Sequence, residues 1–261
     1  MRVLVTGATG KAGRAALRAL LERGAEGRAL VRDPETADLP AEEEVVRGDL
    51  AEPGAAFDGA EAAFLLSGFA DPDTAELAER AGVRRVARLW SGYWGPVEDA
   101  FSRSPVEWTA LQPGSFLGNS VVWADGIRER GEVAEPFVDV AESMVHEADV
   151  GAVGAAVLLE PGHAGRVYEL TGGEAVSVRD RIDALAEALD RPLKLIELSE
   201  AEARRRWRSE GYDEGLVEAL VGWMQRPPEE ATRVSPDVER VLGRPPLTFA
   251  AWLSEHLDAF R

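Results

Sequence analysis

The chain has 261 residues, enough for one large domain or for one domain with a small appendage. Its 29 basic and 47 acidic residues give a net charge of −18, a poor match for nucleic acid or an anionic membrane, because both require clustered cations. The absence of cysteine excludes disulfides, thiolate metal sites and cysteine nucleophiles.

The first half of the chain alternates strands with helices. Short apolar runs predict the strands, and apolar residues at helical spacing predict the helices between them. We expect strands at residues 3–5, 28–31, 44–46, 62–66, 86–90 and 108–111, and helices at residues 12–23, 73–81 and, for a turn or two, 97–102. This alternation favours an α/β fold with a doubly wound parallel sheet, the Rossmann fold, and helices on both of its faces.

The pattern changes after about residue 114. Predicted here are helices at residues 148–159, 177–189 and 248–260, strands at 167–170 and 193–198, and a helix that begins at the capping box 199–202. We assign residues 1–114 to the Rossmann core, with residues 146–172 returning to it. Residues 115–145 and 173–261 are expected to form a smaller C-terminal α+β lobe that holds the substrate.

The strongest motif is a glycine-rich turn, Thr-Gly-Ala-Thr-Gly-Lys-Ala-Gly at residues 6–13, between the first strand and the first helix. A dinucleotide diphosphate requires a tight turn at Gly7, close backbone approach at Gly10 and close packing at Gly13. The first helical turn then offers N–H groups and a positive dipole end to the phosphates. The motif predicts dinucleotide binding by Gly7, Thr9, Gly10, Lys11, Ala12 and Gly13.

The residue after the second strand separates NAD from NADP. An acidic residue there binds the ribose 2′-hydroxyl of NAD, whereas an arginine accepts the extra phosphate of NADP. The chain has Arg32 at this position, and Lys11 and Arg14 lie near the glycine-rich turn. We therefore expect NADP(H). The alternative is that Arg32 only pairs with Asp33.

Several segments together resemble the NmrA-like branch of the atypical short-chain dehydrogenases/reductases. These are residues 3–10, 30–34, 48–50, 81–86, 107–114, 146–150 and 168–172, with Phe116 and Asn119, so the resemblance spans nearly the whole chain. It implies an NAD(P)-binding oxidoreductase.

The resemblance also implies further cofactor contacts. Asp49 and Leu50 would flank the adenine. The adenosine ribose would be lined by Leu66, Ser67 and Gly68, and the loop that follows Pro113 and includes Phe116 would pass beside the nicotinamide.

The catalytic pair that is usual in this superfamily is absent. Standard members protonate a carbonyl with a Tyr-x-x-x-Lys motif and a serine, but no tyrosine of this chain has a lysine four residues later. The candidate catalytic residues near the expected nicotinamide position are Ser91 and Tyr93. Alternatively, Tyr93 and Trp94 are loop aromatics that cover the cofactor or the core. Glu98 is expected to be an exposed acid at a helix start.

The other polar and aromatic features favour structural roles. His146 is expected to be structural, and because no two histidines have ligand spacing, we predict no metal site. The arginine run at residues 204–208 indicates a solvated helix face. The aromatic-rich stretch from Trp207 to Met224 is expected to be mostly core, although it could also cover a flat, apolar substrate.

These features lead to three functional hypotheses. The first is an NADPH-dependent reductase of a ketone or quinone, with an aromatic polycyclic metabolite as one candidate substrate. A quinone tolerates the missing lysine, because its reduction gives a stabilised hydroquinone anion. The second is a non-catalytic, NADP(H)-sensing regulatory protein, and the third is an isomerase or cyclase on the same scaffold. Because the first residues already form a strand, we expect no signal peptide and a cytoplasmic location.

Overall fold

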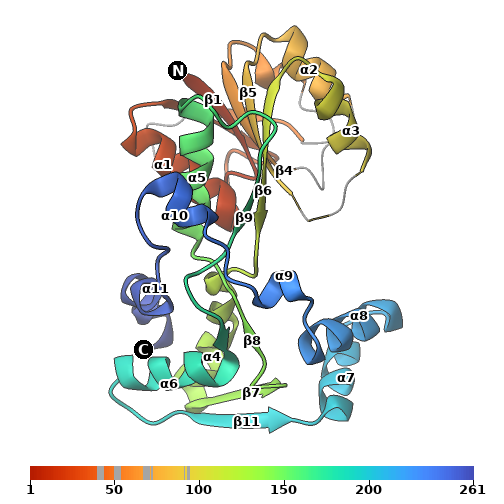
Figure 1. Cartoon of the computed structure of the whole chain (residues 1–261). Coiled ribbons are helices and arrows are strands. Elements are labelled where there is room, and N and C mark those ends of the chain that lie inside the picture. The colour runs from red at the N-terminus through yellow and green to blue at the C-terminus, as the bar shows by residue number, and fades with distance from the viewer. Residues whose placement is uncertain (40–43, 50–53, 67–70, 72, 91, 93–94) are drawn as a thin grey trace. The chain divides into compact units, whose positions relative to one another are not determined.

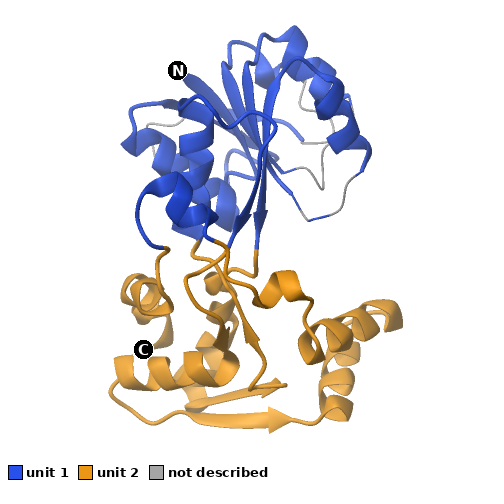
Figure 2. Cartoon of the chain, viewed as in Figure 1, with its two compact units in different colours: residues 1–113, 147–170, 236–245 blue, residues 114–146, 171–235, 246–261 orange. Residues whose placement is uncertain are grey.

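The computed structural model describes residues 1–39, 44–49, 54–66, 71, 73–90, 92 and 95–261. Their contacts divide the chain into two compact units (Figure 2). The first unit consists of Met1–Pro113, Glu147–Leu170 and Pro236–Pro245, and the second of Gly114–His146, Thr171–Ser235 and Pro246–Arg261.

A seven-stranded parallel sheet forms the centre of the first unit (Figure 1). Its strands are β1 (Arg2–Thr6), β2 (Glu26–Val31), β3 (Glu44–Arg47), β4 (Ala62–Leu66), β5 (Arg85–Leu89), β6 (Glu107–Pro113) and β9 (Val167–Leu170). They lie in the order β3-β2-β1-β4-β5-β6-β9, and each neighbouring pair is parallel. The order reverses at β1, which has β2 on one side and β4 on the other, and ligands bind at such a switch point.

Helices cover both faces of this sheet, so the predicted doubly wound Rossmann fold is confirmed. On one face α1 (Lys11–Glu22) packs against α5 (Glu147–Leu159), and on the other lie α2 (Thr74–Arg80) and α3 (Pro96–Arg103) (Figure 1). Alternate residues of each strand point to the α2 and α3 face. The core on this side includes Leu4, Ala63, Leu65, Val86 and Phe101, each at most 1 % exposed.

Residues 236–245 pack with the first unit, whereas the sequence analysis placed all of residues 173–261 in the smaller lobe. Their helix α10 (Asp237–Leu242) contacts α5 and β9. The Asp237 carboxylate accepts a 3.0 Å hydrogen bond from the Glu169 N–H, and Arg244 lies 2.7 Å from the fully buried Asp149. A buried carboxylate needs a cation, and residue 244 supplies it, which explains the return of this segment.

The second unit combines two small sheets with helices. Strand β7 (Glu132–Pro136) pairs in parallel with β11 (Lys194–Leu198), and β8 (Ala141–Glu142) pairs antiparallel with β10 (Val176–Ser177). Helices α4 (Ala124–Arg130), α6 (Val178–Ala188) and α11 (Phe249–His256) contribute to a core around the buried Trp252. Shorter elements are η1 (Gly54–Phe57), which belongs to the first unit, and η3 (Leu117–Trp123), α9 (Glu229–Thr232) and η4 (Leu257–Phe260) in the second.

Helices α7 (Glu200–Ser209) and α8 (Glu214–Gln225) have a small core of their own. The predicted capping box at Ser199 is present. Arg206 hydrogen-bonds to Glu135 at 2.7 Å, so the arginine run is not simply a solvated face. Trp207 is buried as expected, whereas Tyr212 and Trp223 are more than 40 % exposed, because this core is too small to cover them.

Across the described ranges of the chain, no helix combines the length and the apolar character needed to cross a membrane.

Candidate functional site

The glycine-rich turn has the geometry that its sequence predicts. Gly7 has a φ of +62°, and its carbonyl accepts a 2.8 Å hydrogen bond from the Gly10 N–H. A Cβ atom at Gly13 would lie 2.2 Å from the Gly7 carbonyl oxygen, a distance that no side chain tolerates. The first turn of α1 therefore packs directly on the β1–α1 turn, and only glycine permits this approach.

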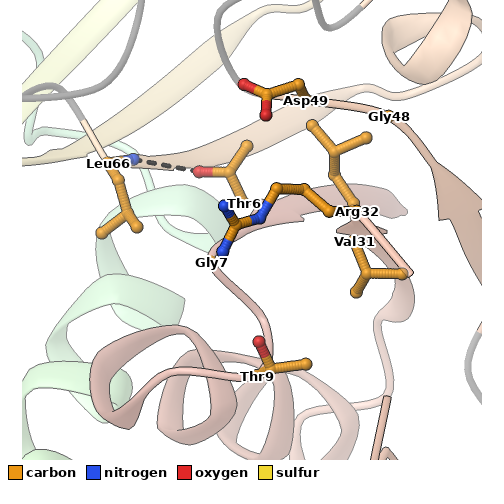
Figure 3. Close-up of a pocket in the computed structure, with 9 residues that line it drawn as sticks. Thr6, Gly7, Thr9, Val31, Arg32, Gly48, Asp49 and Leu66 are labelled. Atoms are coloured by element: carbon orange, nitrogen blue, oxygen red, sulfur yellow. Dashed lines mark hydrogen bonds between the residues drawn. The ribbon is translucent and has the colours of Figure 1, made fainter. Parts of the chain in front are cut away.

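Thr6 joins the carboxyl ends of β1 and β4. Its hydroxyl donates to the Phe64 carbonyl at 3.2 Å and accepts the Leu66 N–H at 3.0 Å, the dashed contact in Figure 3. Leu66 is thereby held over the turn, where a Cβ atom added to Gly7 would lie 2.3 Å from its Cδ1 atom. This contact sets one wall of the space above the turn.

A pocket of about 260 Å³ opens at the carboxyl ends of β1, β2 and β4 (Figure 3). Five of its lining residues are predicted cofactor contacts: Gly7, Thr9, Arg32, Asp49 and Leu66. The prediction missed Thr6, Leu30, Val31 and Gly48. Thr6 is the last residue of β1, and Leu30 and Val31 are the last two residues of β2. Their position at the carboxyl edge of the predicted sheet could have identified them as pocket residues.

Arg32 supplies the positive charge of this pocket, and its side chain extends over the turn in the view of Figure 3. The alternative pairing of Arg32 with Asp33 does not occur in the structure, where Asp33 instead pairs with Arg47 at 3.6 Å. Arg14 pairs with Asp38 at 2.9 Å. Within the described ranges Arg32 has no ion pair, so its guanidinium fork is available to a phosphate.

The remaining predicted cofactor contacts fall into three groups. Gly10, Lys11, Ala12 and Gly13 form the turn and the start of α1 beside the pocket lining. Pro113 ends β6 in the first unit, and Phe116 belongs to the second unit. Outside the described residues lie Leu50, Ser67, Gly68, the candidate catalytic residues Ser91 and Tyr93, and Trp94.

The prediction that Glu98 is exposed is wrong. Glu98 is 5 % exposed and forms a 3.0 Å ion pair with Arg88, which is fully buried. It lies in the first turn of α3 as expected, and its second carboxylate oxygen accepts the Gly95 N–H at 3.0 Å. Helix-start acids are exposed when only the helix dipole holds them. Here a buried cation on the adjacent strand draws the side chain inward.

His146, which is expected to be structural, and Lys194 both lie in the second unit. His146 is buried, with its Nε2 atom 3.9 Å from a Glu255 carboxylate oxygen. Lys194 donates to Glu132 at 2.8 Å. No group of three or more potential metal-ligating side chains occurs among the residues that the structure describes.

The pocket fits a dinucleotide. Gly7, Gly10 and Gly13 carry no side chain that would keep a diphosphate away from the backbone of the turn. Leu30, Val31 and Leu66 provide apolar walls, and Arg32 provides a cation at the position that distinguishes NADP from NAD.

Comparisons with known proteins agree with this geometry. The NAD(P)H-binding family model matches residues 7–91. The chain is 34% identical over 280 residues to a (4-alkanoyl-5-oxo-2,5-dihydrofuran-3-yl)methyl phosphate reductase of Streptomyces griseus, covering 99% of both chains. It is 31% identical over 283 residues to an NAD(P)H azoreductase of Xenophilus azovorans, again covering 99% of both.

Solved structures show the same fold. The NADPH-dependent quinone oxidoreductase QOR2 of Escherichia coli has a TM-score of 0.77 and 26% identity, with 98% of this chain and 99% of that chain covered. The negative transcriptional regulator NmrA in complex with NADP has a TM-score of 0.73 and 19% identity, with 98% and 95% covered, which shows likeness of fold alone.

The chain is accordingly an NAD(P)H-dependent oxidoreductase that acts on a small molecule, and NADP(H) is its cofactor. This assignment is supported by the glycine-rich turn, by the strand order of the sheet, and by relatives that match over nearly their full length. It belongs to the NmrA-like group of the atypical short-chain dehydrogenases/reductases.

Proposed function

We propose that the protein reduces a conjugated, electron-poor acceptor of the quinone type rather than a simple ketone. The observation that carries this proposal is the missing tyrosine–lysine pair. Of the two lysines in the chain, Lys11 begins α1 beside the glycine-rich turn, and Lys194 is hydrogen-bonded to Glu132 in the second unit. Neither follows a tyrosine by four residues, so no lysine is placed by sequence to acidify a tyrosine hydroxyl.

The electronic structure of the acceptor decides whether this loss is tolerable. Reduction of an isolated ketone develops charge on one oxygen, which a positioned acid must neutralise in the transition state. A quinone spreads the same charge over its ring and second oxygen, and the hydroquinone anion that forms is stable before any proton arrives. The reaction then depends mainly on proximity and exclusion of water, not on a strong acid.

The names of the relatives support this class of acceptor. A quinone and an azo compound are conjugated acceptors. The dihydrofuranone named in the Streptomyces griseus relative has a ring C=C bond conjugated with two carbonyl groups. Each of the three can hold the charge that a hydride brings as a delocalised anion. A flat quinone also matches the apolar, planar substrate expected from the sequence.

The residues of the pocket would hold NADP(H), which when bound supplies the hydride. Arg32 would bind the 2′-phosphate, the Gly7 to Gly13 turn would receive the diphosphate, and Asp49 would flank the adenine. Ser91 and Tyr93 remain the candidate hydrogen-bond donors to the acceptor oxygen. No feature of the described residues favours the regulatory or the isomerase hypothesis over this one.

Steady-state oxidation of NADPH tests the proposal, with 1,4-naphthoquinone compared against cyclohexanone and acetophenone. We expect kcat/KM for the quinone to exceed that for either ketone by about 100-fold or more, the range that a general acid contributes. Control reactions without enzyme measure the direct oxidation of NADPH by the quinone, and this rate is subtracted. Equal kcat/KM values for ketone and quinone, or no turnover of the quinone, would overturn the proposal.

The same assay measures what Tyr93 contributes. If the hydroquinone anion needs no strong acid, Tyr93→Phe should lower quinone turnover by less than about tenfold, below the usual contribution of general acid catalysis. A larger loss would make Tyr93 an obligatory proton donor and would contradict the argument from delocalised charge.

A further inference from the structure

An ion pair lies inside the first unit, on the α3 side of the sheet. The Arg88 Nη1 atom is 3.0 Å from Glu98 Oε1, and the two side chains are 0% and 6% exposed. The guanidinium carbon lies 5.4 Å from the ring centre of Phe101 and 5.0 Å from that of Trp108. Burial lowers the pKa of Arg88, and the Glu98 carboxylate opposes that change. Both charges have therefore been moved from water into apolar surroundings.

Stability does not explain this pair. Removing two charges from water costs about as much as their attraction returns, and apolar side chains of similar volume are often as stable in such a place. The Nε and Nη2 atoms of Arg88 are also buried without a hydrogen-bond partner among the described residues, which adds to the cost. The pair must therefore be explained by what it holds in place.

The Glu98 carboxylate joins the two ends of one connection. Its Oε1 atom binds Arg88, the second-last residue of β5, and its Oε2 atom accepts the N–H of Gly95, the N-cap of α3. Between these ends, Gly92 has a φ of +89°, and a Cβ atom there would lie 3.0 Å from Gln112 Nε2. The β5–α3 connection is thus fixed where it leaves the strand and where it enters the helix.

The connection begins at the edge of the sheet where the cofactor pocket opens. β5 is the neighbour of β4, and Leu89 pairs in register with the pocket-lining Leu66. Ser91 and Tyr93, the candidate hydrogen-bond donors, belong to this connection in the sequence. A displacement of about 1 Å in such a segment is enough to cost 100-fold in rate.

We propose that the Arg88–Glu98 pair is a positioning device for the reduction, which ties the end of β5, beside the cofactor pocket, to the start of α3. This inference rests on the proposed reductase function. Both residues act through the connection, since Arg88 lies beneath α3 and neither side chain lines the pocket. The pair should consequently affect turnover of the acceptor and leave cofactor affinity unchanged.

An apolar replacement of both residues tests the proposal in the full-length protein. In Arg88→Met/Glu98→Leu, no charge is left unpaired, so we expect Tm to be retained or raised. NADPH affinity, measured by fluorescence titration, should not change, whereas kcat with 1,4-naphthoquinone should fall about tenfold or more. The matched control is Arg85→Met/Glu107→Leu, which removes the 3.1 Å ion pair at the opposite end of the same strand and should keep the wild-type kcat.

A second variant separates positioning from packing. Arg88→Met/Glu98→Gln keeps a side-chain oxygen that can accept the Gly95 N–H, and it should recover part of the lost kcat. Amide hydrogen exchange of residues 89–98 should be faster in the leucine variant than in the glutamine variant. A kcat within twofold of wild type for Arg88→Met/Glu98→Leu, or unchanged exchange in this segment, would overturn the proposal. Failure of the proposed function would be seen separately, as no quinone turnover by the wild type, and the exchange measurement would still decide the role of the pair.

Discussion

The Asp33 carboxylate lies 3.6 Å from the Arg47 guanidinium, while the preceding residue in the chain, Arg32, lines the cofactor pocket. This arrangement separates two adjacent opposite charges. Arg47 partly neutralises the acid that would otherwise attract Arg32 and repel a bound phosphate. The Arg32 guanidinium can therefore bind a ligand. Both arginines lie at the carboxyl ends of neighbouring strands, Arg32 after β2 and Arg47 at the end of β3, but only Arg32 lines the pocket.

Replacement of Arg32 should therefore change the preference between the two nicotinamide cofactors. Hydrogen bonds to charged groups contribute about 1.5–3 kcal/mol, so Arg32→Gln should weaken NADPH binding by about 10- to 150-fold. NADH lacks the 2′-phosphate, and its affinity should change little. Fluorescence titration with both cofactors measures this, and Arg84→Gln is the control, because Arg84 is more than half exposed and pairs with Glu61 where β4 and β5 begin, at the edge of the sheet away from the pocket. Equal losses for NADPH and NADH would place the phosphate elsewhere.

A single methyl group at Gly13 should abolish cofactor binding. In Gly13→Ala the new Cβ atom would meet the Gly7 carbonyl oxygen at 2.2 Å and the Ala8 nitrogen at 2.9 Å, and both are backbone atoms that cannot rotate away. The turn and α1 must separate, so NADPH binding should become unmeasurable by titration.

The control for this variant is Gly222→Ala in α8, where nothing lies within 4 Å of the added atom. There the protein should gain about 0.5–1 kcal/mol of stability, because alanine is the better helix former. Normal NADPH binding by Gly13→Ala would show that the turn is not held as closely as the structure indicates.

The sequence was sufficient for the parts of the fold that local patterns encode. Apolar runs placed every strand of the large sheet, and the glycine spacing placed the turn that begins the pocket. It was not sufficient where contacts with another element decide whether a strand forms or a side chain is buried. Strand β7 forms because β11, about sixty residues later, pairs with it. Glu98 is buried because the fold packs α3 against β5 and so brings Glu98 to Arg88, ten residues earlier in the chain. The local pattern around residue 98 shows both charges but not that they pair in the interior.

The lysine in β11 should prove unrelated to catalysis. Lys194 is two-thirds exposed and donates to Glu132, whose pKa it lowers through that hydrogen bond. Lys194→Gln should leave kcat with a quinone unchanged within error. Its effect on stability should be small, because an exposed ion pair contributes little to stability. A loss of turnover with unchanged Tm would instead identify Lys194 as the missing partner of a tyrosine.

The pH dependence of stability should include a contribution from His163. Its Nδ1 atom lies 2.8 Å from the Tyr168 hydroxyl, and burial lowers the pKa of His163, with Glu160 opposing and Arg85 and Arg166 adding to that change. The unfolded chain, with a histidine pKa of about 6.5, therefore binds this proton more readily than the folded protein does. The stability that His163 contributes to the folded protein is complete above about pH 6.5, and it is lost as the pH falls through the lower pKa of the folded state.

Between about pH 7.5 and pH 5.5 the Tm of the wild type should fall more than that of His163→Gln, because the other titrating groups are common to both proteins. Parallel Tm curves for the two proteins would show that folding does not change the proton affinity of His163.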